Sequence, residues 1–290
     1  MPLVSTGELV SAAAAGGRGI AAFNVITLEH AEAIATGAER AGAPAVLQVS
    51  ENAVRFHGGE PGPVAAAVAA VARASSARLS LHLDHVESAE LLRAAPAAGF
   101  SSVMFDASKL PYAENLKATA QAVRHCHDHG VWIEAELGAV GGKDGAGNDG
   151  PSLGAHAPGV RTDPAEALVF VAETGVDALA VAVGSSHAMT RRTAALDHAL
   201  IKALRDAVPV PLVLHGSSGV PDEEIRRAVA AGMVKINVGT ALNSAFTGAV
   251  RRFLTAHPST VDPRKYLVPA REAMAGTVAG FLRVISGSGE

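Results

Sequence analysis

The sequence predicts a (β/α)8 (TIM) barrel that forms a single domain over residues 1–290. Roughly eight short apolar runs each precede a stretch with helical periodicity. Several of these runs are apolar almost throughout, as expected for parallel strands that helices cover on their outer face. No linker divides the chain. An open, doubly wound sheet has the same alternation of strands and helices, but the number of strands favours the closed barrel.

The expected elements follow one another along the whole chain. We expect strands at 19–24, 45–50, 79–84, 102–105, 131–136, 178–183, 211–214 and 234–237. We expect helices at 28–41, 63–75, 88–97 and 112–129, helices that begin near 163 and 221, and a helical remainder broken near 257–263. Ser88 is suited to an N-cap, and Pro164 to the first turn of a helix.

Composition excludes several classes of partner. The chain is 49% hydrophobic and 18% charged, with a formal net charge of −4 and no block of basic residues. Binding to nucleic acid or to an anionic membrane surface is therefore not expected. The N-terminus shows no secretory signal. Cys126 has no second cysteine to pair with, and we expect it to be a buried apolar side chain in a cytoplasmic protein.

Polar residues end the predicted strands. They are Asn24, Ser50, Asp84, His85, Asp106, Glu134, Glu136, His187, His215 and Asn237. In a barrel these ends meet at one rim, where catalysis takes place. A single histidine at a strand end is commonly a hydrogen-bonded structural residue. Three histidines at matching strand ends favour a catalytic zinc site, because three imidazoles with one open position form such a site.

Two glycine-containing loops predict an anion site. Gly216-Ser217-Ser218-Gly219 follows the seventh predicted strand, and Asn237-Val238-Gly239-Thr240 follows the eighth. Backbone N–H groups at such turns bind anions, and TIM barrels often bind phosphate after strands 7 and 8. Plain glycine-rich turns are the alternative. A third stretch, 138–158, is also glycine-rich but has no apolar period, and we expect a functional or disordered loop there.

Several motifs, in order along nearly the whole chain, resemble those of the class II, metal-dependent ketose-bisphosphate aldolases. The resemblance lies in Ala22-Phe23-Asn24-Val25, Leu81-His82-Leu83-Asp84-His85, Val103-Met104-Phe105-Asp106, Glu134-Ala135-Glu136-Leu137-Gly138, Gly184-Ser185-Ser186-His187, Leu214-His215-Gly216-Ser217-Ser218-Gly219, Lys235-Ile236-Asn237-Val238 and Asp262-Pro263-Arg264-Lys265-Tyr266-Leu267. The chain is similar to the shorter branch of that family, which contains tagatose-bisphosphate and many bacterial fructose-bisphosphate enzymes.

The resemblance implies a role for each matched residue. The catalytic Zn²⁺ would be held by His85, His187 and His215. Asp84 would donate and accept the proton at the aldehyde oxygen. Asp106 and Glu136 match carboxylates at a second, alternative metal position. The dihydroxyacetone phosphate half of the substrate would contact Asn24, Ser50, Ala188, Gly216, Ser217, Ser218, Asn237, Val238, Gly239 and Thr240.

The resemblance further implies a glycolytic or related carbohydrate-metabolic lyase, a homodimer or homotetramer, and a bound monovalent cation.

The chain departs from the family's sequence pattern at three places. The loop reads Gly141-Gly142-Lys143-Asp144, so that Asp144 falls where a glutamate is expected to exchange the C3 proton. Ala188 replaces a usual glycine. Gly239 stands where fructose enzymes often have Asp and tagatose enzymes Ala, which leaves the sugar stereochemistry open.

The expected chemistry is reversible cleavage of a ketose 1,6-bisphosphate to dihydroxyacetone phosphate and an aldehyde such as glyceraldehyde 3-phosphate. Breaking the C3–C4 bond requires a Lewis acid for the negative charge and a base for the C4 hydroxyl proton. The alternatives are an aldolase acting on another phosphorylated ketose, a zinc hydrolase, and a non-catalytic accessory subunit. A zinc hydrolase would not need the two predicted phosphate-binding loops. An accessory subunit should have lost metal ligands, whereas this chain keeps all three histidines and Asp84.

Overall fold

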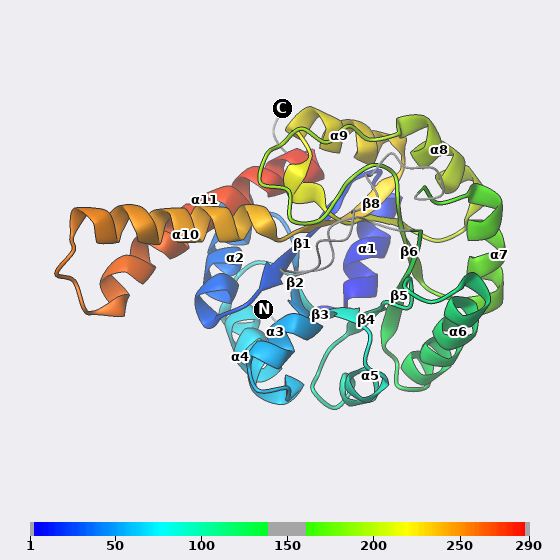
Figure 1. The fold of residues 1–290 in the computed structure, drawn as a ribbon, viewed down its shortest axis with the longest axis horizontal. Helices are drawn as coiled ribbons and strands as arrows, with labels where there is room; N and C mark the ends of the chain where they lie inside the picture. Colours follow the sequence, from blue (N-terminus) through cyan, green and yellow to red (C-terminus); the bar gives the residue numbers. More distant parts are fainter. Residues whose placement is uncertain (1–2, 139–160, 288–290) are drawn as a thin grey trace.

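The computed structural model describes residues 3–138 and 161–287. Within these ranges, parallel strands close into a barrel in sequence order, with each strand bonded to the next and the last to the first (Figure 1). The strands are β1 (Ile20–Val25), β2 (Ala45–Ser50), β3 (Leu79–Val86), β4 (Ser102–Phe105), β5 (Trp132–Leu137), β6 (Ala178–Val181), β7 (Leu212–Leu214) and β8 (Met233–Val238). The prediction of a (β/α)8 barrel is confirmed, and the single-domain assignment stays a prediction.

An outer ring of helices covers the strands. It consists of α2 (Leu28–Ala41), α3 (Glu51–Phe56), α4 (Pro61–Ala74), α5 (Ala89–Ala94), α6 (Tyr112–Asp128), α7 (Pro164–Thr174), α8 (His198–Ala207), α9 (Asp222–Ala231), α10 (Thr240–Ala256) and α11 (Pro263–Ser286), with a 3-10 turn, η1 (Ser217–Gly219). Side chains that point outward from the strands, such as Leu79, Leu81 and Leu83 of β3, join the main apolar core beneath these helices. Cys126 lies in that core, as expected.

The barrel interior is polar along part of its length. On β3, Ser80, His82 and Asp84 alternate with the outward leucines and are all buried. Since successive side chains of a strand point to opposite faces, these three share the inner face. Hydroxyl groups from Thr6, Ser80 and Ser102 bond to one another at its base, and His82 Nδ1 lies 2.7 Å from Ser102 Oγ.

Two short helices lie outside the regular alternation of strands and helices. α1 (Thr6–Ala15) begins at Ser5, whose hydroxyl accepts a hydrogen bond from the Glu8 amide, and it contacts β1, β3 and β8. Thr6 places α1 at the N-terminal mouth of the barrel, because its hydroxyl bonds to Ser80 near the start of β3. α3 follows β2 directly and is capped by Ser50.

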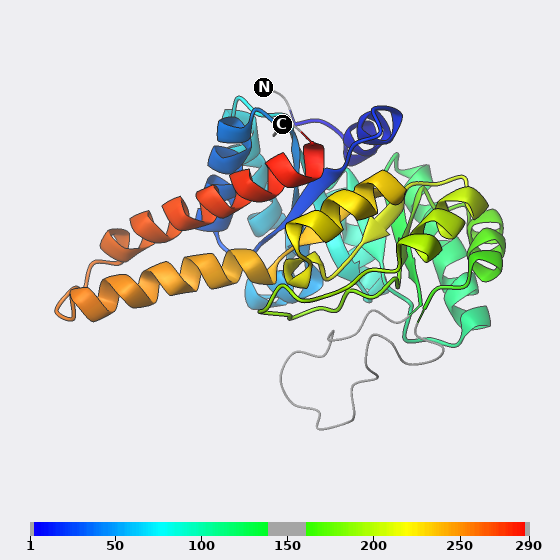
Figure 2. The same ribbon diagram turned by 90° about the horizontal axis from the view of Figure 1, so that it is seen from above.

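The last two helices form a long hairpin that projects from one side of the barrel (Figures 1 and 2). The break expected near 257–263 separates α10 from α11, and Asp262 caps α11 by accepting the Arg264 amide at 3.0 Å. α11 packs against both α10 and α2. Among the described residues, no helix has both the length and the apolar character needed to cross a bilayer.

Candidate active site

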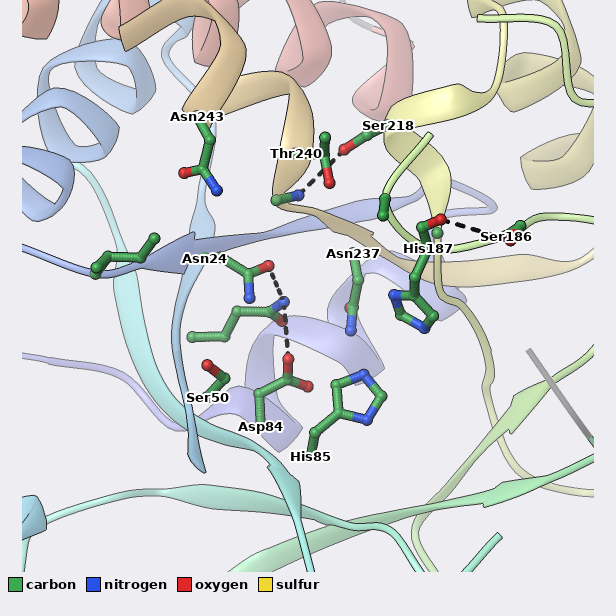
Figure 3. Close-up of a pocket in the computed structure, with 15 residues that line it drawn as sticks. Asn24, Ser50, Asp84, His85, Ser186, His187, Ser218, Asn237, Thr240 and Asn243 are labelled. Carbon is green, nitrogen blue, oxygen red and sulfur yellow. Dashed lines mark hydrogen bonds between the residues drawn. The ribbon is translucent and has the colours of Figure 1, made fainter. Parts of the chain in front are cut away.

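A cavity of about 260 Å³ opens at the carboxyl ends of the strands (Figure 3). Its lining comes from β1, β2, β3 and β8, from the loops after β1, β6, β7 and β8, and from the start of α10. The lining residues are Asn24, Ile26, Gln48, Ser50, Asp84, His85, Ser186, His187, Ala188, Gly216, Ser218, Asn237, Gly239, Thr240 and Asn243. A second cavity of about 210 Å³ adjoins it and shares Asn24, Ser50, His85 and His187. The polar strand ends therefore converge as the sequence predicts.

A bulge in β3 explains how two consecutive residues reach the same cavity. In a regular strand, Asp84 and His85 would point to opposite faces of the sheet. The register between β3 and β4 shifts between Leu83 and Val86, and His85 has φ of +49°. A non-glycine residue rarely adopts this left-handed conformation, and such conformations cluster at functional sites. The irregularity turns the His85 ring into the cavity beside the Asp84 carboxyl group.

Three imidazoles converge at this cavity: His85 and His187 line it, and His215 is buried beside them. Each of His85, His187 and His215 offers a ring nitrogen, and these three nitrogens lie within 4.8 Å of one another. The ring centroids are 4.8 to 5.8 Å apart, and the rings meet edge to face at 72° to 83°. Three converging imidazole nitrogens are a donor set typical of a divalent transition metal. The residues present therefore fit a metal ion.

Buried carboxylates surround the imidazoles. His85 Nδ1 lies 2.9 Å from Asp106 Oδ2, while Asp106 Oδ1 accepts the Ser108 hydroxyl at 2.6 Å. Glu136 Oε2 lies 3.4 Å from His215 Nδ1. His85, Asp106 and Glu136 form a second group whose possible ligand atoms lie within 4.8 Å of one another. The family resemblance implies an alternative metal position at these same two acids.

Asp84 is the acid among the described residues that line the first cavity. Its side chain is almost fully buried, and this burial raises the pKa of Asp84, partly opposed by the charges of His85 and Lys235. Gln48 Nε2 donates to Asp84 Oδ2 at 3.3 Å and to Asn24 Oδ1 at 2.7 Å. His82 Nε2 lies 3.8 Å from Asp84 Oδ1, and burial lowers the pKa of His82 well below its usual value. Asp84 therefore faces a polar amide and a neutral ring.

The loops after β7 and β8 are joined through Ser218. Its hydroxyl oxygen accepts hydrogen bonds from the amides of Gly239 at 3.3 Å and Ala241 at 3.1 Å, at the N-terminus of α10. Gly216 adopts a φ of +69°, and a Cβ there would lie 2.6 Å from the backbone of Ser186. A side chain at 216 would therefore force the loop after β7 away from the loop after β6. The remaining N–H groups at the start of α10 favour an anion.

Most of the predicted substrate-binding residues line this cavity, but Ser217 and Val238 do not. Of the predicted metal ligands, Asp106 lines only the second cavity, and His215 and Glu136 are fully buried and line neither. Ser217 is buried, and its hydroxyl donates to the Leu214 carbonyl at 3.2 Å. Val238 alternates with Asn237 along β8 and packs into the apolar core. For these two positions only the backbone remains available for contact with a ligand. Asp144 and positions 139–160 of the expected loop lie outside the described residues.

Four residues that line the cavity have no role in the sequence-based prediction: Ile26, Gln48, Ser186 and Asn243. Gln48 precedes Ser50 by two positions on β2, so the period of the strand places both on the inner face. That spacing was a usable signal in an otherwise apolar run. Asn243 lies one turn after Thr240 on α10, and its Oδ1 is 3.4 Å from His30 Nε2. Its contribution depends on the direction in which α10 leaves β8, which the sequence does not specify.

The fold and the site define a class of protein: a TIM-barrel enzyme with a candidate metal site and with loops suited to bind phosphate after β7 and β8. Residues 4–290 match the family model described as "Fructose-bisphosphate aldolase class-II". The fructose-bisphosphate aldolase of Geobacillus stearothermophilus is 40% identical over 291 residues, covering 100% of this chain and 99% of the relative. "Probable fructose-bisphosphate aldolase" of Bacillus subtilis is also 40% identical over 291 residues, covering 100% of both chains.

A solved structure agrees with the sequence relatives. The YdjI aldolase from Escherichia coli K12 has a TM-score of 0.83 and 29% identity, with 99% of this chain and 100% of that chain covered. The chain belongs to the class II fructose-bisphosphate aldolase family and is a carbon–carbon lyase of carbohydrate metabolism. The family is metal-dependent, consistent with the clustered histidines and acids.

Proposed function

We propose that the chain is a zinc-dependent aldolase that reversibly cleaves fructose or tagatose 1,6-bisphosphate to dihydroxyacetone phosphate and glyceraldehyde 3-phosphate. The observation that carries this proposal is the convergence of His85, His187 and His215 beside the buried carboxyl group of Asp84. The names of the relatives from Geobacillus stearothermophilus and Bacillus subtilis support the fructose-bisphosphate substrate.

The three histidines would hold the metal. A bound Zn²⁺ supplies Lewis-acid stabilisation for the negative charge that C3–C4 cleavage leaves beside the C2 carbonyl. Asp106 and Glu136 would serve a second, alternative metal position, since they form a separate cluster with His85. From the family resemblance, we also propose that a monovalent cation binds.

Asp84 would perform the proton transfer at the C4 oxygen. In cleavage its carboxylate takes the hydroxyl proton while the C3–C4 electron pair moves toward C3, and in condensation it returns that proton. Gln48 orients the carboxyl group through a hydrogen bond to Oδ2. The second proton transfer, at C3, is assigned to Asp144 on the strength of the sequence resemblance alone.

The phosphate of the dihydroxyacetone half would bind between the loops after β7 and β8. Gly216, Ser218, Gly239 and Thr240 line the cavity at this point, where α10 begins. Ser217 and Val238 would contribute backbone N–H groups only. Asn24, Ser50, Ala188 and Asn237 would contact the sugar chain from the remaining walls.

The stereochemistry at C4 stays open in this proposal, because Gly239 offers no side chain. A Cβ at position 239 would lie 2.9 Å from Asn24 Oδ1, so that the Asn24 amide occupies the space a larger residue would need. An aldolase acting on another phosphorylated ketose is the corresponding second candidate. From the sequence and its family resemblance, we also propose that the protein is cytoplasmic and assembles as a homodimer or homotetramer.

A cleavage assay tests the proposal. The purified protein should release dihydroxyacetone phosphate from fructose or tagatose 1,6-bisphosphate, and the ratio of kcat/KM for the two sugars gives the specificity. Fructose 1-phosphate, which lacks the second phosphate, serves as the comparison substrate. Cleavage of neither bisphosphate by zinc-loaded protein would contradict the proposal.

A further inference from the structure

Lys235 is a fully buried lysine on β8 to which the proposed chemistry gives no task. Its Nζ donates a hydrogen bond to Glu134 Oε2 at 2.8 Å, and Glu134 is also fully buried. Glu134 lies on β5, which is not a neighbour of β8 in the barrel. The ion pair therefore crosses the barrel interior, and Lys235 is not among the residues that line the cavity.

The second oxygen of Glu134 holds one of the three clustered histidines. His215 Nε2 lies 2.9 Å from Glu134 Oε1, and both side chains are 0% exposed. A carboxylate only accepts hydrogen bonds, so that Nε2 carries the hydrogen in this contact. In the neutral ring, Nδ1 is then the nitrogen with a lone pair. Nδ1 faces the side of the ring where Glu136 Oε2 lies 3.4 Å away.

The lysine is needed because the glutamate is buried. A carboxylate removed from water without a partner is strongly destabilising, and a cation at hydrogen-bonding distance compensates for the lost solvation. The Lys235 contact also fixes the plane of the carboxylate, since it occupies Oε2 and leaves Oε1 directed at His215. A metal-binding histidine commonly has its other ring nitrogen oriented by a carboxylate in this way.

We propose that Lys235 and Glu134 are positioning residues for His215. Together they hold its ring as the Nε2–H tautomer and present Nδ1 to the metal position formed with His85 and His187. This inference rests on the proposed metal site. It gives Lys235 a role that requires no contact with substrate and no covalent bond to it.

The first test is a double-mutant cycle on zinc affinity. The variants are Lys235→Met, Glu134→Gln and the double variant, with Lys202→Met, an exposed lysine on α8, as the control. The dissociation constant of Zn²⁺ is measured by chelator competition on metal-free protein. Lys235→Met should weaken binding about 10–100-fold. In the Glu134→Gln background the same change should alter the constant by less than about twofold, because Lys235 acts through Glu134. The constant of Lys202→Met should equal that of the wild type.

Fully additive losses of zinc affinity would overturn the proposal, since Lys235 would then act independently of Glu134. An unchanged constant in Lys235→Met would overturn it as well. The wild-type protein supplies a test that needs no stable variant: the ¹⁵N spectrum of its histidines in the metal-free state, with the His215 signals identified from their loss in His215→Gln. A protonated Nε2 and an unprotonated Nδ1 would support the proposal, and the opposite tautomer would overturn it.

These readouts separate this inference from the proposed function. A wild-type protein that cleaves no ketose bisphosphate but shows the predicted non-additive zinc affinities would contradict the function and support the positioning role. A protein that cleaves the sugar while Lys235→Met binds zinc normally would support the function and overturn the positioning role.

Discussion

Gln48 Nε2 lies 3.3 Å from Asp84 Oδ2 and donates a hydrogen bond to it. The same nitrogen donates to Asn24 Oδ1 at 2.7 Å, so one amide orients the proposed acid/base and a neighbouring residue of the cavity. Both Gln48 and Asp84 are almost fully buried. A hydrogen bond to a charged group in such surroundings contributes about 1.5–3 kcal/mol.

Replacing Gln48 with methionine should therefore lower kcat about tenfold or more, because about 1.4 kcal/mol corresponds to a factor of ten in rate. Bound zinc should stay at the wild-type level, since Gln48 is not in the metal cluster. Gln121→Met, on the exposed face of α6, is the matched control. Steady-state kinetics with metal analysis gives both quantities. A kcat within twofold of wild type would show that Gln48 does not support proton transfer by Asp84.

Asp84→Asn should lower kcat by roughly 10²–10⁴-fold, the usual contribution of a positioned proton-transfer group. The amide keeps the shape of the carboxyl group but cannot take the C4 hydroxyl proton. Zinc content should not change. Asp206→Asn, at an exposed site on α8, is the control. If the Asp84→Asn protein lost its zinc and excess zinc restored the full rate, Asp84 would be a support for the metal site instead.

Cys126 should resist thiol reagents in the native protein. The side chain is 0% exposed in the apolar core, and burial raises the pKa of its thiol to about 12. Almost no reactive thiolate is therefore present near pH 8. The measurement is the rate of reaction with a chromogenic disulfide reagent, with and without denaturant. Rapid reaction of one thiol in the folded protein would show that the packing around α6 is wrong.

Glu224 should make stability depend on pH. Hydrogen bonds from the Leu196 amide at 3.1 Å and from His198 lower the pKa of Glu224. A carboxyl group with a lowered pKa in the folded state stabilises the fold above its unfolded pKa, and this contribution is lost as pH falls through the folded value. Glu224→Gln should therefore lower Tm most near pH 7, and the difference from wild type should shrink toward about pH 4. A difference in Tm that stays constant with pH would contradict this assignment.

Much of the site could be predicted because strand period and strand ends are visible in sequence. The run from Ser80 to His85 alternates apolar and polar residues, which indicates a strand with one polar face, and its end falls at the barrel mouth. The same logic located His187 and His215. The helix α3 escaped prediction, since it follows β2 without a break.

Other features depend on contacts between distant segments. The left-handed conformation of His85 arises where β3 slips against β4, and no local pattern indicates that slip. The role of Lys235 depends on Glu134 and His215, which approach it only when β5, β7 and β8 close around the interior. The sequence therefore indicated which residues gather at the rim, but not which of their atoms face one another.

The most direct test of the central claim is metal-dependent cleavage of the ketose bisphosphates. Purified protein is stripped with chelator, assayed for release of dihydroxyacetone phosphate, and assayed again after Zn²⁺ is restored, beside a His215→Ala variant treated in the same way. Stripping should abolish cleavage, Zn²⁺ should restore it, and His215→Ala should bind zinc weakly and stay inactive. Cleavage that persisted in metal-free wild-type protein and in His215→Ala would contradict a metal-dependent mechanism.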